Sequence, residues 1–573
     1  YTLGDLKNDA LAGMVVGVVA LPLSMALAVG VGVPPQHGLY TAIVAGFVVA
    51  VLGGSRTQVT GPTAAFIVIL APIYAKFGMA GLLLSGIMGG LILVAMGLAR
   101  LGKLIEFIPH PVTTGFTAGI ALVIAALQIK DLLGLRVAHM PDHFFGRLGA
   151  MYEARGSASW VEPLLGLMTF AILVYLRRVF QRVPGPVVAL PIAALVAFGL
   201  TRLMPGLQIE TIASRFQTTI GGHTLSGIPQ LPPLPVLPWA LGGADGQPFS
   251  FDFETLRALL PSAFAVAILG AIESLLSAVV ADGLARTKHD PDAELLALGV
   301  GNLIAPFFGG IPATGAIART ATNIRSGARS PIASMVHAAT VLLAVLVLAP
   351  LLGYLPMSAL AALLVLVAWN MSDAKHFVHI LRVAPKSDVV VLLTCFSLTV
   401  CFDMAVGVSV GMVLASFLFM RRMAEVTQAK LARADSSQYP GLPGPLPPGV
   451  VLYDISGPLF FGAAQRAMGA LTTIGGGKDR VVILSMDGVN TMDATGLVAL
   501  ESALEQLERH KVLAILSGAQ DQPLALLKKA HVAELPGVLL CETAQEALAV
   551  AARHLAEAPA SVSRGVQSLR PAP

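Results

Sequence analysis

The sequence has few charged residues for its length. Only 12% of the 573 residues are Asp, Glu, Lys or Arg, whereas soluble proteins carry about 25%. Hydrophobic residues make up 55% of the chain, and the mean hydropathy is +0.78. A soluble globule of this composition would precipitate. The sequence therefore excludes that class and predicts an integral membrane protein.

Cysteines and clusters of basic residues are also scarce. The chain has 3 Cys, of which Cys395 and Cys401 lie in an apolar segment and Cys541 lies in the more polar C-terminal part. This excludes a disulfide framework and a cysteine-based metal cluster. The net charge of +4 comes from basic residues scattered singly between apolar segments, which argues against nucleic-acid binding. We find no nucleophile motif or phosphate-binding loop, so we expect no enzyme activity and no cofactor or metal.

Long apolar segments dominate the first 425 residues. Because about 20 apolar residues cross the hydrocarbon core of a bilayer, we predict fourteen transmembrane segments, at residues 11–29, 38–54, 61–75, 80–98, 107–129, 163–180, 186–201, 258–280, 294–308, 315–325, 332–350, 353–370, 388–402 and 404–420. With the N-terminus inside, the cytoplasmic segments hold about twice as many Lys and Arg residues as the other side. We therefore expect an inner (plasma) membrane protein with both ends in the cytoplasm.

The third and tenth apolar segments are interrupted by Gly and Pro at their starts. The third begins Gly61-Pro62-Thr63-Ala64-Ala65, and the tenth begins Gly309-Gly310-Ile311-Pro312-Ala313-Thr314-Gly315-Ala316 and ends early, at Arg325. Both are third of seven in their half of the membrane region, and an odd number of segments inverts the second half. The two helices therefore enter from opposite faces, and we expect their N-termini to meet near the membrane midplane.

Two facing helix N-termini form a favourable site for an anion. Each offers unpaired N–H groups and about half a positive charge, so together they bind an oxyanion without ionised side chains. We expect the donors at Thr63, Ala64, Ala65 and Phe66 and at Gly315, Ala316, Ile317 and Ala318, with the Thr63 hydroxyl as a further donor. The alternative, that Gly and Pro only kink two packed helices, is less favoured for a matched pair than for one segment.

Ionisable and hydroxyl side chains inside the apolar segments are further candidates. Glu273 lies within 258–280, where a carboxylate costs about 2.5–3.5 kcal/mol to insert; a carboxyl group that gains a proton there could couple proton and anion movement. Ser277 lies one turn further on the same face. Arg319, one turn into the tenth segment, suits a carboxylate, and Ser24 in the first segment could line the same cavity. The alternatives are a structural carboxyl group, an arginine that reaches the surface, and ordinary helix packing. Asp403, between the last two segments, is expected to be exposed.

The composition changes after residue 425. We predict a transmembrane domain at 1–425, a linker rich in Pro and Gly at 426–449, a soluble α/β domain at 450–557 and a disordered tail at 558–573. In the α/β domain we expect strands at 450–455, 481–486, 511–516 and 537–541 and helices at 495–509 and 542–555. Thr495 is expected to be the N-cap of the first of these helices or, alternatively, a phosphorylation site.

These segments resemble the SulP (sulfate permease) family of anion transporters from about Asp5 to Leu555. The stretches that carry the resemblance are Asp9-Ala10-Leu11-Ala12-Gly13, Pro34-Pro35-Gln36-His37-Gly38-Leu39-Tyr40, Gly53-Gly54-Ser55-Arg56 with Gly61-Pro62, Gly270-Ala271-Ile272-Glu273-Ser274-Leu275-Leu276, Gly301-Asn302 and Ala318-Arg319-Thr320. The C-terminal part resembles a STAS domain through Asp493-Ala494-Thr495-Gly496-Leu497. The resemblance implies an α-helical membrane protein with 14 spans in a 7+7 inverted repeat, divided into core and gate domains, and a cytoplasmic α/β STAS domain.

Within the family, the chain resembles most closely the proton-coupled dicarboxylate transporters. Gly61-Pro62-Thr63-Ala64-Ala65-Phe66, Gln128-Ile129-Lys130-Asp131, Asn302 to Gly310, Val367-Ala368-Trp369-Asn370-Met371 and Phe419-Met420-Arg421-Arg422 carry this resemblance. Sodium-coupled bicarbonate transporters of the family have Asp where this chain has Glu273, and Thr where it has Ile317 and Ser277. These differences argue against a sodium site. Many members have Gln where Ser24 stands, which leaves room for a larger substrate.

The sequence thus predicts a secondary transporter that carries four-carbon dicarboxylates (succinate, fumarate, aspartate) with protons. Three alternatives stay open: bicarbonate or sulfate transport, a passive anion channel, and a signalling protein whose tail binds a cytoplasmic partner. The resemblance also suggests a homodimer. The expected partners are therefore the anion, protons, the lipid bilayer and a second copy of the chain.

Overall fold

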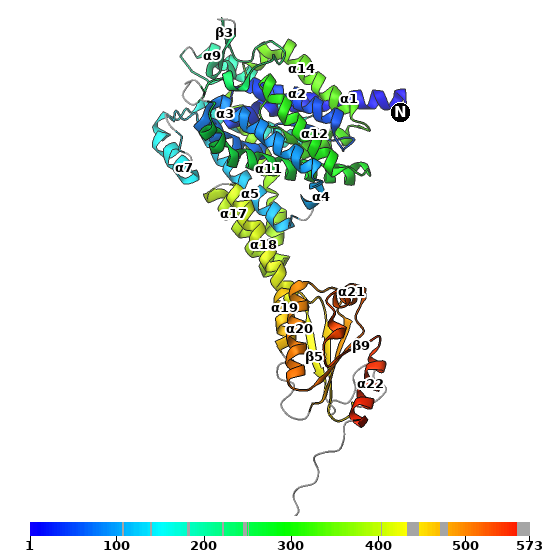
Figure 1. Ribbon diagram of the computed structural model, residues 1–573. Coiled ribbons are helices and arrows are strands. Elements are labelled where there is room, and N and C mark those ends of the chain that lie inside the picture. Colours follow the sequence, from blue (N-terminus) through cyan, green and yellow to red (C-terminus); the bar gives the residue numbers. More distant parts are fainter. Residues whose placement is uncertain are drawn as a thin grey trace, which may run out of the picture. The chain divides into compact units, whose positions relative to one another are not determined.

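The computed structural model of the chain describes residues 1–105, 108–137, 140–141, 143–179, 184–204, 206–220, 223–243, 249, 251–402, 404–432, 446–469, 471 and 479–557. Packing divides the chain into two compact units, Tyr1–Ala415 and Ser416–Pro573, whose elements are labelled in Figure 1. Asp403, residues 433–445 of the expected linker and the expected tail at 558–573 lie outside the described residues.

One set of helices in the first unit forms what we call the first bundle. It consists of α1 (Leu3–Val31), α2 (Pro35–Leu52), α3 (Ala64–Leu98), α11 (Phe253–Ala285), α12 (Pro291–Ile304), α13 (Ile317–Arg325) and α14 (Ile332–Leu352). Glycines allow these helices to pack closely. A Cβ added at Gly17 of α1 would lie 2.6 Å from the Thr340 Cβ of α14, and one added at Gly90 of α3 would lie 2.8 Å from the Gly299 carbonyl oxygen of α12.

Most of the other helices of this unit form the second bundle. It consists of α5 (His110–Leu127), α6 (Ile129–Leu133), α8 (Val161–Val179), α9 (Gly185–Leu203), α15 (Met357–Ser372), α16 (Ala374–Val383) and α17 (Lys386–Cys401). The two bundles meet where α1 and α3 contact α15 and α5. They correspond to the core and gate domains that the family resemblance implies. The helix α18 (Met404–Val426) follows α17.

Every one of the expected transmembrane segments coincides with a helix. The third and fourth segments form one helix, α3, which is interrupted at Gly78, where φ is 67°. Within the described residues, 9 helices are long and apolar enough to cross a membrane, and a bent pair that ends in α8 would bring the number to 10. The expected segments at 294–308, 315–325 and 388–402 appear as shorter helices of 14, 9 and 16 residues. Fourteen spans therefore stay a prediction.

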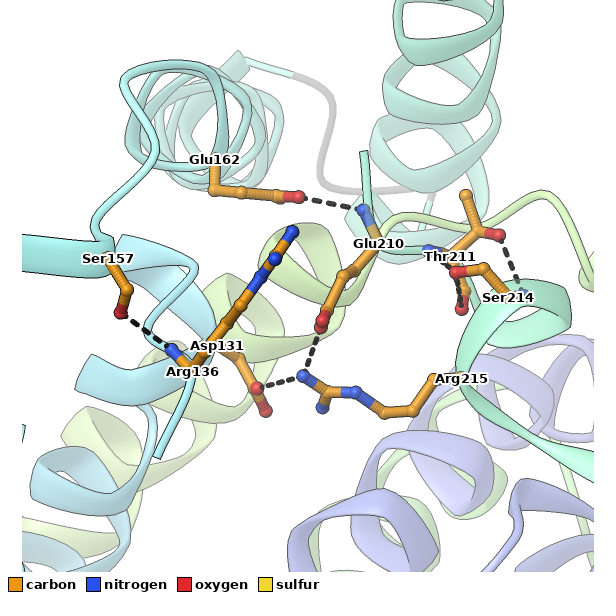
Figure 2. A network of polar contacts seen from close by, with 8 residues as sticks. All are labelled: Asp131, Arg136, Ser157, Glu162, Glu210, Thr211, Ser214 and Arg215. Carbon is orange, nitrogen blue, oxygen red and sulfur yellow. Dashed lines mark hydrogen bonds and ion pairs between the residues drawn. The ribbon is translucent and has the colours of Figure 1, made fainter. Parts of the chain in front are cut away.

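The segment between α9 and α11 is fixed to the second bundle by an ion-pair network (Figure 2). It contains α10 (Ile212–Arg215) and the hairpin of β2 (Gln217–Ile220) and β3 (His223–Ser226). Arg215 pairs with Asp131 of α6 at 2.8 Å and with Glu210. Glu162, at the start of α8, accepts a hydrogen bond from the Glu210 N–H at 2.9 Å. The short helices α4 (Gly102–Ile105) and α7 (Phe144–Glu153) lie in the other connections.

The second unit contains a five-stranded sheet with the order β5-β6-β7-β8-β9. Its elements are β5 (Gln428–Ala432), β6 (Val450–Ser456), α19 (Phe461–Gly469), β7 (Val481–Gly488), α20 (Ala494–Arg509), β8 (Leu513–Ser517), α21 (Asp521–Lys529), β9 (Val538–Cys541) and α22 (Ala544–Glu557). The strand β5 is antiparallel to β6, and the other neighbours are parallel. A hydrophobic cluster covers each face of the sheet.

The strands and helices expected in the C-terminal part all form, but one detail is corrected. The expected linker contains β5, and α19 and α21 were not expected. Asp493, not Thr495, is the N-cap of α20, because the Asp493 carboxylate accepts a hydrogen bond from the Gly496 N–H at 2.7 Å. Thr495 lies inside the first turn. An Asp at this position satisfies one of the free N–H groups of the helix and favours its positive end.

The glycine contacts of the first bundle predict which helix positions tolerate a side chain. Gly90→Leu should lower the melting temperature of the detergent-solubilised protein, because the side chain forces apart α3 and α12, and overpacking costs about 1–3 kcal/mol. Gly199→Leu in α9 is the matched control, since a Cβ there has no atom within 4 Å. Equal melting temperatures for the two variants would contradict the packing described here.

Candidate functional site

The starts of α3 and α13 are joined by two short strands. In β1 (Thr60–Gly61) and β4 (Thr314–Gly315), Thr60 lies opposite Gly315 and Gly61 opposite Thr314, in an antiparallel pair. The helix α3 begins at Ala64 and α13 at Ile317, directly after these strands. Because the strands are antiparallel, the two helices leave the pair with opposite chain directions. The expected meeting of the two helix starts is therefore confirmed.

Side chains from α12 and α2 hold the segment that leads into α13. The Asn302 side chain of α12 makes two hydrogen bonds with the backbone of Ala313: its Nδ2 donates to the carbonyl oxygen at 2.9 Å, and its Oδ1 accepts from the N–H at 2.7 Å. Thr41 Oγ1 of α2 donates to the Ile311 carbonyl oxygen at 2.9 Å. These bonds satisfy backbone groups that the interrupted helix leaves without intrahelical partners.

Side chains from α13 and α14 hold the segment that leads into α3. Asn323 Nδ2 of α13 donates to the Thr57 carbonyl oxygen at 2.9 Å, and Ser334 Oγ of α14 donates to the Gln58 carbonyl oxygen at 2.7 Å. The side chains of Thr41, Asn302, Asn323 and Ser334 are all buried. The non-helical backbone at this depth is thus surrounded by protein, which is the condition under which membrane proteins tolerate it.

A buried carboxylate, Glu294, fixes the position of the segment before β1. Its Oε2 accepts from the N–H groups of Gly54 at 3.1 Å and Ser55 at 3.2 Å, and its Oε1 accepts from Gln58 Nε2 at 2.8 Å and Ser274 Oγ at 3.2 Å. Glu294 is 1% exposed. Four donors from two elements compensate its desolvation, so this carboxylate links α12 to both the β1 segment and α11.

Glu273 of α11 lies against the start of α3. Thr63, the N-cap residue of α3, donates its hydroxyl to Glu273 Oε2 at 2.7 Å. Glu273 is partly buried, and its carboxyl group interacts electrostatically with the guanidinium of Arg319. The candidate carboxylate, the candidate hydroxyl and the candidate arginine therefore lie around the same pair of helix starts.

Arg319 is buried and does not reach the surface. Its side chain lies beside the β1 segment, where it donates to the Pro62 carbonyl oxygen, and the residue is 2% exposed. Its Nε and Nη1 have no hydrogen-bond partner among the described residues. A Cβ added at Gly61 would lie 2.6 Å from Arg319 Nη1. Gly61 is therefore required for the guanidinium to occupy this position.

The other candidate residues differ in what they contact. Ser277 donates to Thr320 Oγ1 at 3.2 Å, and Thr320 Oγ1 accepts from the Val59 N–H at 3.0 Å, so Ser277 supports the backbone before α3. The Ala316 N–H donates to the Val59 carbonyl oxygen at 2.9 Å. This N–H is therefore already engaged, and Ile317 provides the first N–H inside α13.

The remaining candidates lie in the first turns of α3 and α13 or in α1. Ala64 and Ala65 in the first turn of α3 are buried, whereas Ile317 is 43% exposed. Ser24 is fully buried in α1, which packs against both α3 and α13, and its Oγ has no partner within the described part of the chain. No group of three or more His, Cys, Asp or Glu among the described residues is arranged to hold a metal ion.

Comparison with known proteins gives the family. The model of the sulfate permease family matches residues 6–395, and that of the STAS domain matches residues 445–547. The chain belongs to the sulfate permease family. Its membership confirms the expected helical membrane transporter with a C-terminal STAS domain, a transporter of anions and not an enzyme.

Family members with known names align over nearly the whole chain. The "Putative sulfate transporter YvdB" of Bacillus subtilis (strain 168) is 39% identical over 92% of this chain and 94% of that protein. The bicarbonate transporter BicA of Picosynechococcus sp. is 28% identical over 92% of this chain and 91% of its own length. The solved structure of murine Slc26a9 in the inward-facing state covers 97% of this chain and 92% of that one, with a TM-score of 0.81 and 19% identity, which supports the fold alone.

Sequence reasoning missed three polar side chains of this family member that build the site. Gln58, Glu294 and Asn302 are all buried. Glu294 and Asn302 bond to the segments that carry the helix starts, and Gln58, which lies in one of these segments, bonds to Glu294. Glu294 stands at the start of an apolar segment, and the cost of burying a carboxylate was a usable signal. Gln58 and Asn302 are uncharged, so the cost of burial gives no comparable signal, although Asn302 belongs to the Gly301-Asn302 stretch that carries the family resemblance.

The contact between Gly61 and Arg319 gives a direct test. Gly61→Ala should reduce anion uptake by roughly tenfold or more, because the methyl group displaces the guanidinium, and misplacement by about 1 Å can cost up to 100-fold in activity. Gly283→Ala is the control, since a Cβ at this position of α11 meets no atom within 4 Å. Uptake of a labelled anion into proteoliposomes is measured for both variants and for the wild-type protein. Unchanged uptake for Gly61→Ala would exclude a role for Arg319 at this position.

Proposed function

We propose that this protein is a secondary active transporter that binds a small anion between the starts of α3 and α13 and moves it together with a proton. The observation that carries the proposal is the β1–β4 pair, which brings the two helix starts together beside the buried Arg319 and the partly buried Glu273. Helix N-termini and an arginine with free N–H groups attract an anion, and a carboxyl group at the same place makes binding depend on protons.

The proposed anion site uses backbone groups more than side chains. The first N–H groups of α3, from Ala64 and Ala65, and of α13, from Ile317 onward, have no intrahelical acceptor. Arg319 supplies side-chain donors, and Thr63 adds its hydroxyl when a proton on Glu273 releases it from that carboxylate. Ala316 contributes a small side chain next to the backbone. Gly315 lacks a Cβ because Gln58 occupies that space: a Cβ there would lie 2.3 Å from Gln58 Nε2. We propose that Ser24 of α1 and Ser277 of α11 also lie beside the bound anion.

Glu273 is proposed to couple anion binding to proton binding. An ionised Glu273 accepts the Thr63 hydroxyl and compensates part of the Arg319 charge. An anion that binds at the same helix starts repels this carboxylate and competes with it for Arg319. The anion therefore binds best when Glu273 carries a proton, and by linkage it promotes that protonation. This reciprocity makes the anion and the proton move as a pair.

We propose that movement of the first bundle relative to the second carries the anion across the membrane. Both interrupted helices and α11 belong to the first bundle, so the site would move as one body while the second bundle stays fixed. We propose an inner-membrane protein with cytoplasmic termini that acts as a homodimer. The STAS domain is proposed to bind a cytoplasmic partner, with Thr495 as a possible phosphorylation site.

We propose four-carbon dicarboxylates, such as succinate, fumarate and aspartate, as substrates. Two positive helix ends that face each other suit an anion with two negative groups, and the resemblance within the family favours the dicarboxylate transporters. Sulfate is the second candidate, because it is also a dianion and because the 39% identical relative is named for sulfate transport. Bicarbonate is a weaker alternative, since Ile317 lacks the hydroxyl that a sodium site would use.

An uptake panel with purified protein in proteoliposomes tests the substrate and the mode of transport. With an inward proton gradient, labelled succinate should accumulate against its own gradient, and faster than labelled sulfate or bicarbonate. Empty liposomes are the control. Faster accumulation of sulfate would identify sulfate as the preferred substrate. Equilibration of every anion without any response to the proton gradient would indicate a passive channel.

The pH dependence of uptake tests the role of Glu273. Uptake by the wild-type protein should rise as the outside pH falls from 8 to 6, because the proton is a co-substrate. Glu273→Gln cannot exchange a proton, so its uptake should be nearly independent of pH in the same range. Glu254→Gln, which changes an exposed carboxylate on the same helix, should keep the wild-type profile. A wild-type profile for Glu273→Gln would rule out the coupling role.

A further inference from the structure

The segment between α9 and α11 connects the two bundles. It follows Leu203, the end of α9 in the second bundle, and leads to Phe253, the start of α11 in the first bundle. It contains α10 and the β2–β3 hairpin, and in the proposed orientation it lies on the outer side of the membrane. If one bundle moves relative to the other during transport, this segment has to divide between them. Its contacts show where it divides.

The first part of the segment belongs to the second bundle. Arg215 of α10 pairs with Asp131 of α6 at 2.8 Å, as Figure 2 shows. The Glu210 carbonyl oxygen accepts a hydrogen bond from the N–H of Met357, the first residue of α15, at 2.9 Å. Two elements of the second bundle therefore hold α10, and we expect α10 to stay with them when the bundles move.

The hairpin is attached to α10 without a flexible linker. The helix α10 ends at Arg215, and β2 begins two residues later, at Gln217. The residues that flank the hairpin bond to each other, since the Gly227 N–H donates to the Phe216 carbonyl oxygen at 2.8 Å. The two strands are paired along their length. The helix and the hairpin are therefore one unit that the second bundle carries.

The second part of the segment belongs to the first bundle. Gln230 Nε2 donates to the Leu346 carbonyl oxygen of α14 at 2.5 Å. The Val236 N–H donates to the carbonyl oxygen of Phe307, three residues after α12, at 2.7 Å. The dividing point therefore lies between Gly227 and Gln230. Gly227 has a positive φ of 84°, which glycine adopts without strain, so this residue suits a hinge.

A side-chain hydrogen bond joins the hairpin to the first bundle across this division. Gln36 Nε2, in the first turn of α2, donates to Thr218 Oγ1 of β2 at 2.9 Å. Gln36 is 2% exposed, so water competes little for this bond. The next residue, His37, has its Nδ1 2.6 Å from the Gly309 carbonyl oxygen, in the segment that leads into β4. The bond thus connects the hairpin to the part of the first bundle that carries the proposed anion site.

We propose that the hairpin is an outer latch. The bond between Gln36 and Thr218 holds the outer ends of the two bundles together while the anion site is closed to the outside, and it breaks each time the first bundle moves to open the site to that side. The inference rests on the proposed function, because it takes transport to be a movement of the bundles. Since the bond exists in only one of the two states, its strength sets the balance between them.

Weakening the latch tests its effect on this balance. Thr218→Val removes the acceptor oxygen, so KM for labelled succinate and labelled sulfate offered outside right-side-out membrane vesicles should fall by about 2- to 10-fold. One hydrogen bond stabilises the closed state by roughly that factor, and the apparent affinity follows the fraction of the open state. KM for the same anions offered to inside-out vesicles should not fall. Ser226→Ala, which removes an exposed hydroxyl from the same hairpin, is the matched control and should leave both KM values unchanged. An unchanged outer KM for Thr218→Val would overturn the latch.

Cross-linking tests whether the latch has to open in each cycle. A short, reversible bis-thiosulfonate reagent joins the pair Gln36→Cys with Thr218→Cys, and uptake into proteoliposomes should then fall to the level of empty liposomes and return after reduction. The matched control is Arg136→Cys with Gln208→Cys. Arg136 follows α6 and bonds to Gln208 at 3.3 Å, so this pair joins the segment to the second bundle alone, and joining it should leave uptake unchanged. Wild-type protein treated with the reagent controls for the native cysteines.

Mass spectrometry of the digested protein shows which pairs are joined. Uptake that persists with the Gln36/Thr218 pair joined would overturn the latch while leaving the proposed function intact. Loss of uptake with the control pair joined as well would also overturn it, because the segment would then have to move relative to the second bundle. If the wild-type protein carries neither anion, the proposed function is overturned instead. The reaction of Gln36→Cys with a membrane-impermeant maleimide from the outside then decides about the latch: reaction shows that this buried contact opens, and no reaction would overturn the latch.

Discussion

The structure of the membrane unit depends on one constraint: backbone N–H and C=O groups inside a bilayer need partners within the protein. A chain that interrupts two helices at the same depth creates many such groups at once. Here backbone groups from the two interruptions pair with each other in the antiparallel β1–β4 pair. Side chains such as Asn302 and Ser334 satisfy most of what remains. The first N–H groups of α3 and α13 have no intrahelical acceptor, and these are the groups that the proposed site offers to an anion.

The same arrangement explains why the proposed anion site responds to charge more than to chemical identity. Free N–H groups and a guanidinium bind oxygen acceptors of any small oxyanion, and the site is built from backbone whose geometry does not depend on side-chain type. In this proposal, discrimination between substrates comes from side chains beside the helix starts, such as Ser24 and Ile317. Relatives that share this framework can therefore carry different anions with modest changes of sequence.

Much of the architecture could be predicted from the sequence, because long apolar segments and paired Gly-Pro interruptions have direct physical causes. The meeting of the helix starts followed from the odd number of segments in each half. The contacts of the site could not be predicted in the same way. That the Ala316 N–H is consumed by a neighbouring carbonyl, or that Gln58 bonds to Glu294, depends on which helices pack together. The cap of α20 was misassigned because Asp493 and Thr495 are both good capping residues, and only the helix start decides between them.

The β1–β4 pair also has a consequence for biosynthesis. Pro62 and Arg319, which bond to each other beside this pair, are 257 positions apart in the chain. When the ribosome has inserted α3 into the membrane, none of the partners of β1 from the second half has been made. Backbone groups of the segment before α3 therefore lack part of their hydrogen-bond partners until α13 and α14 enter the bilayer. During synthesis this stretch therefore needs temporary partners, such as water, lipid headgroups or the insertion machinery.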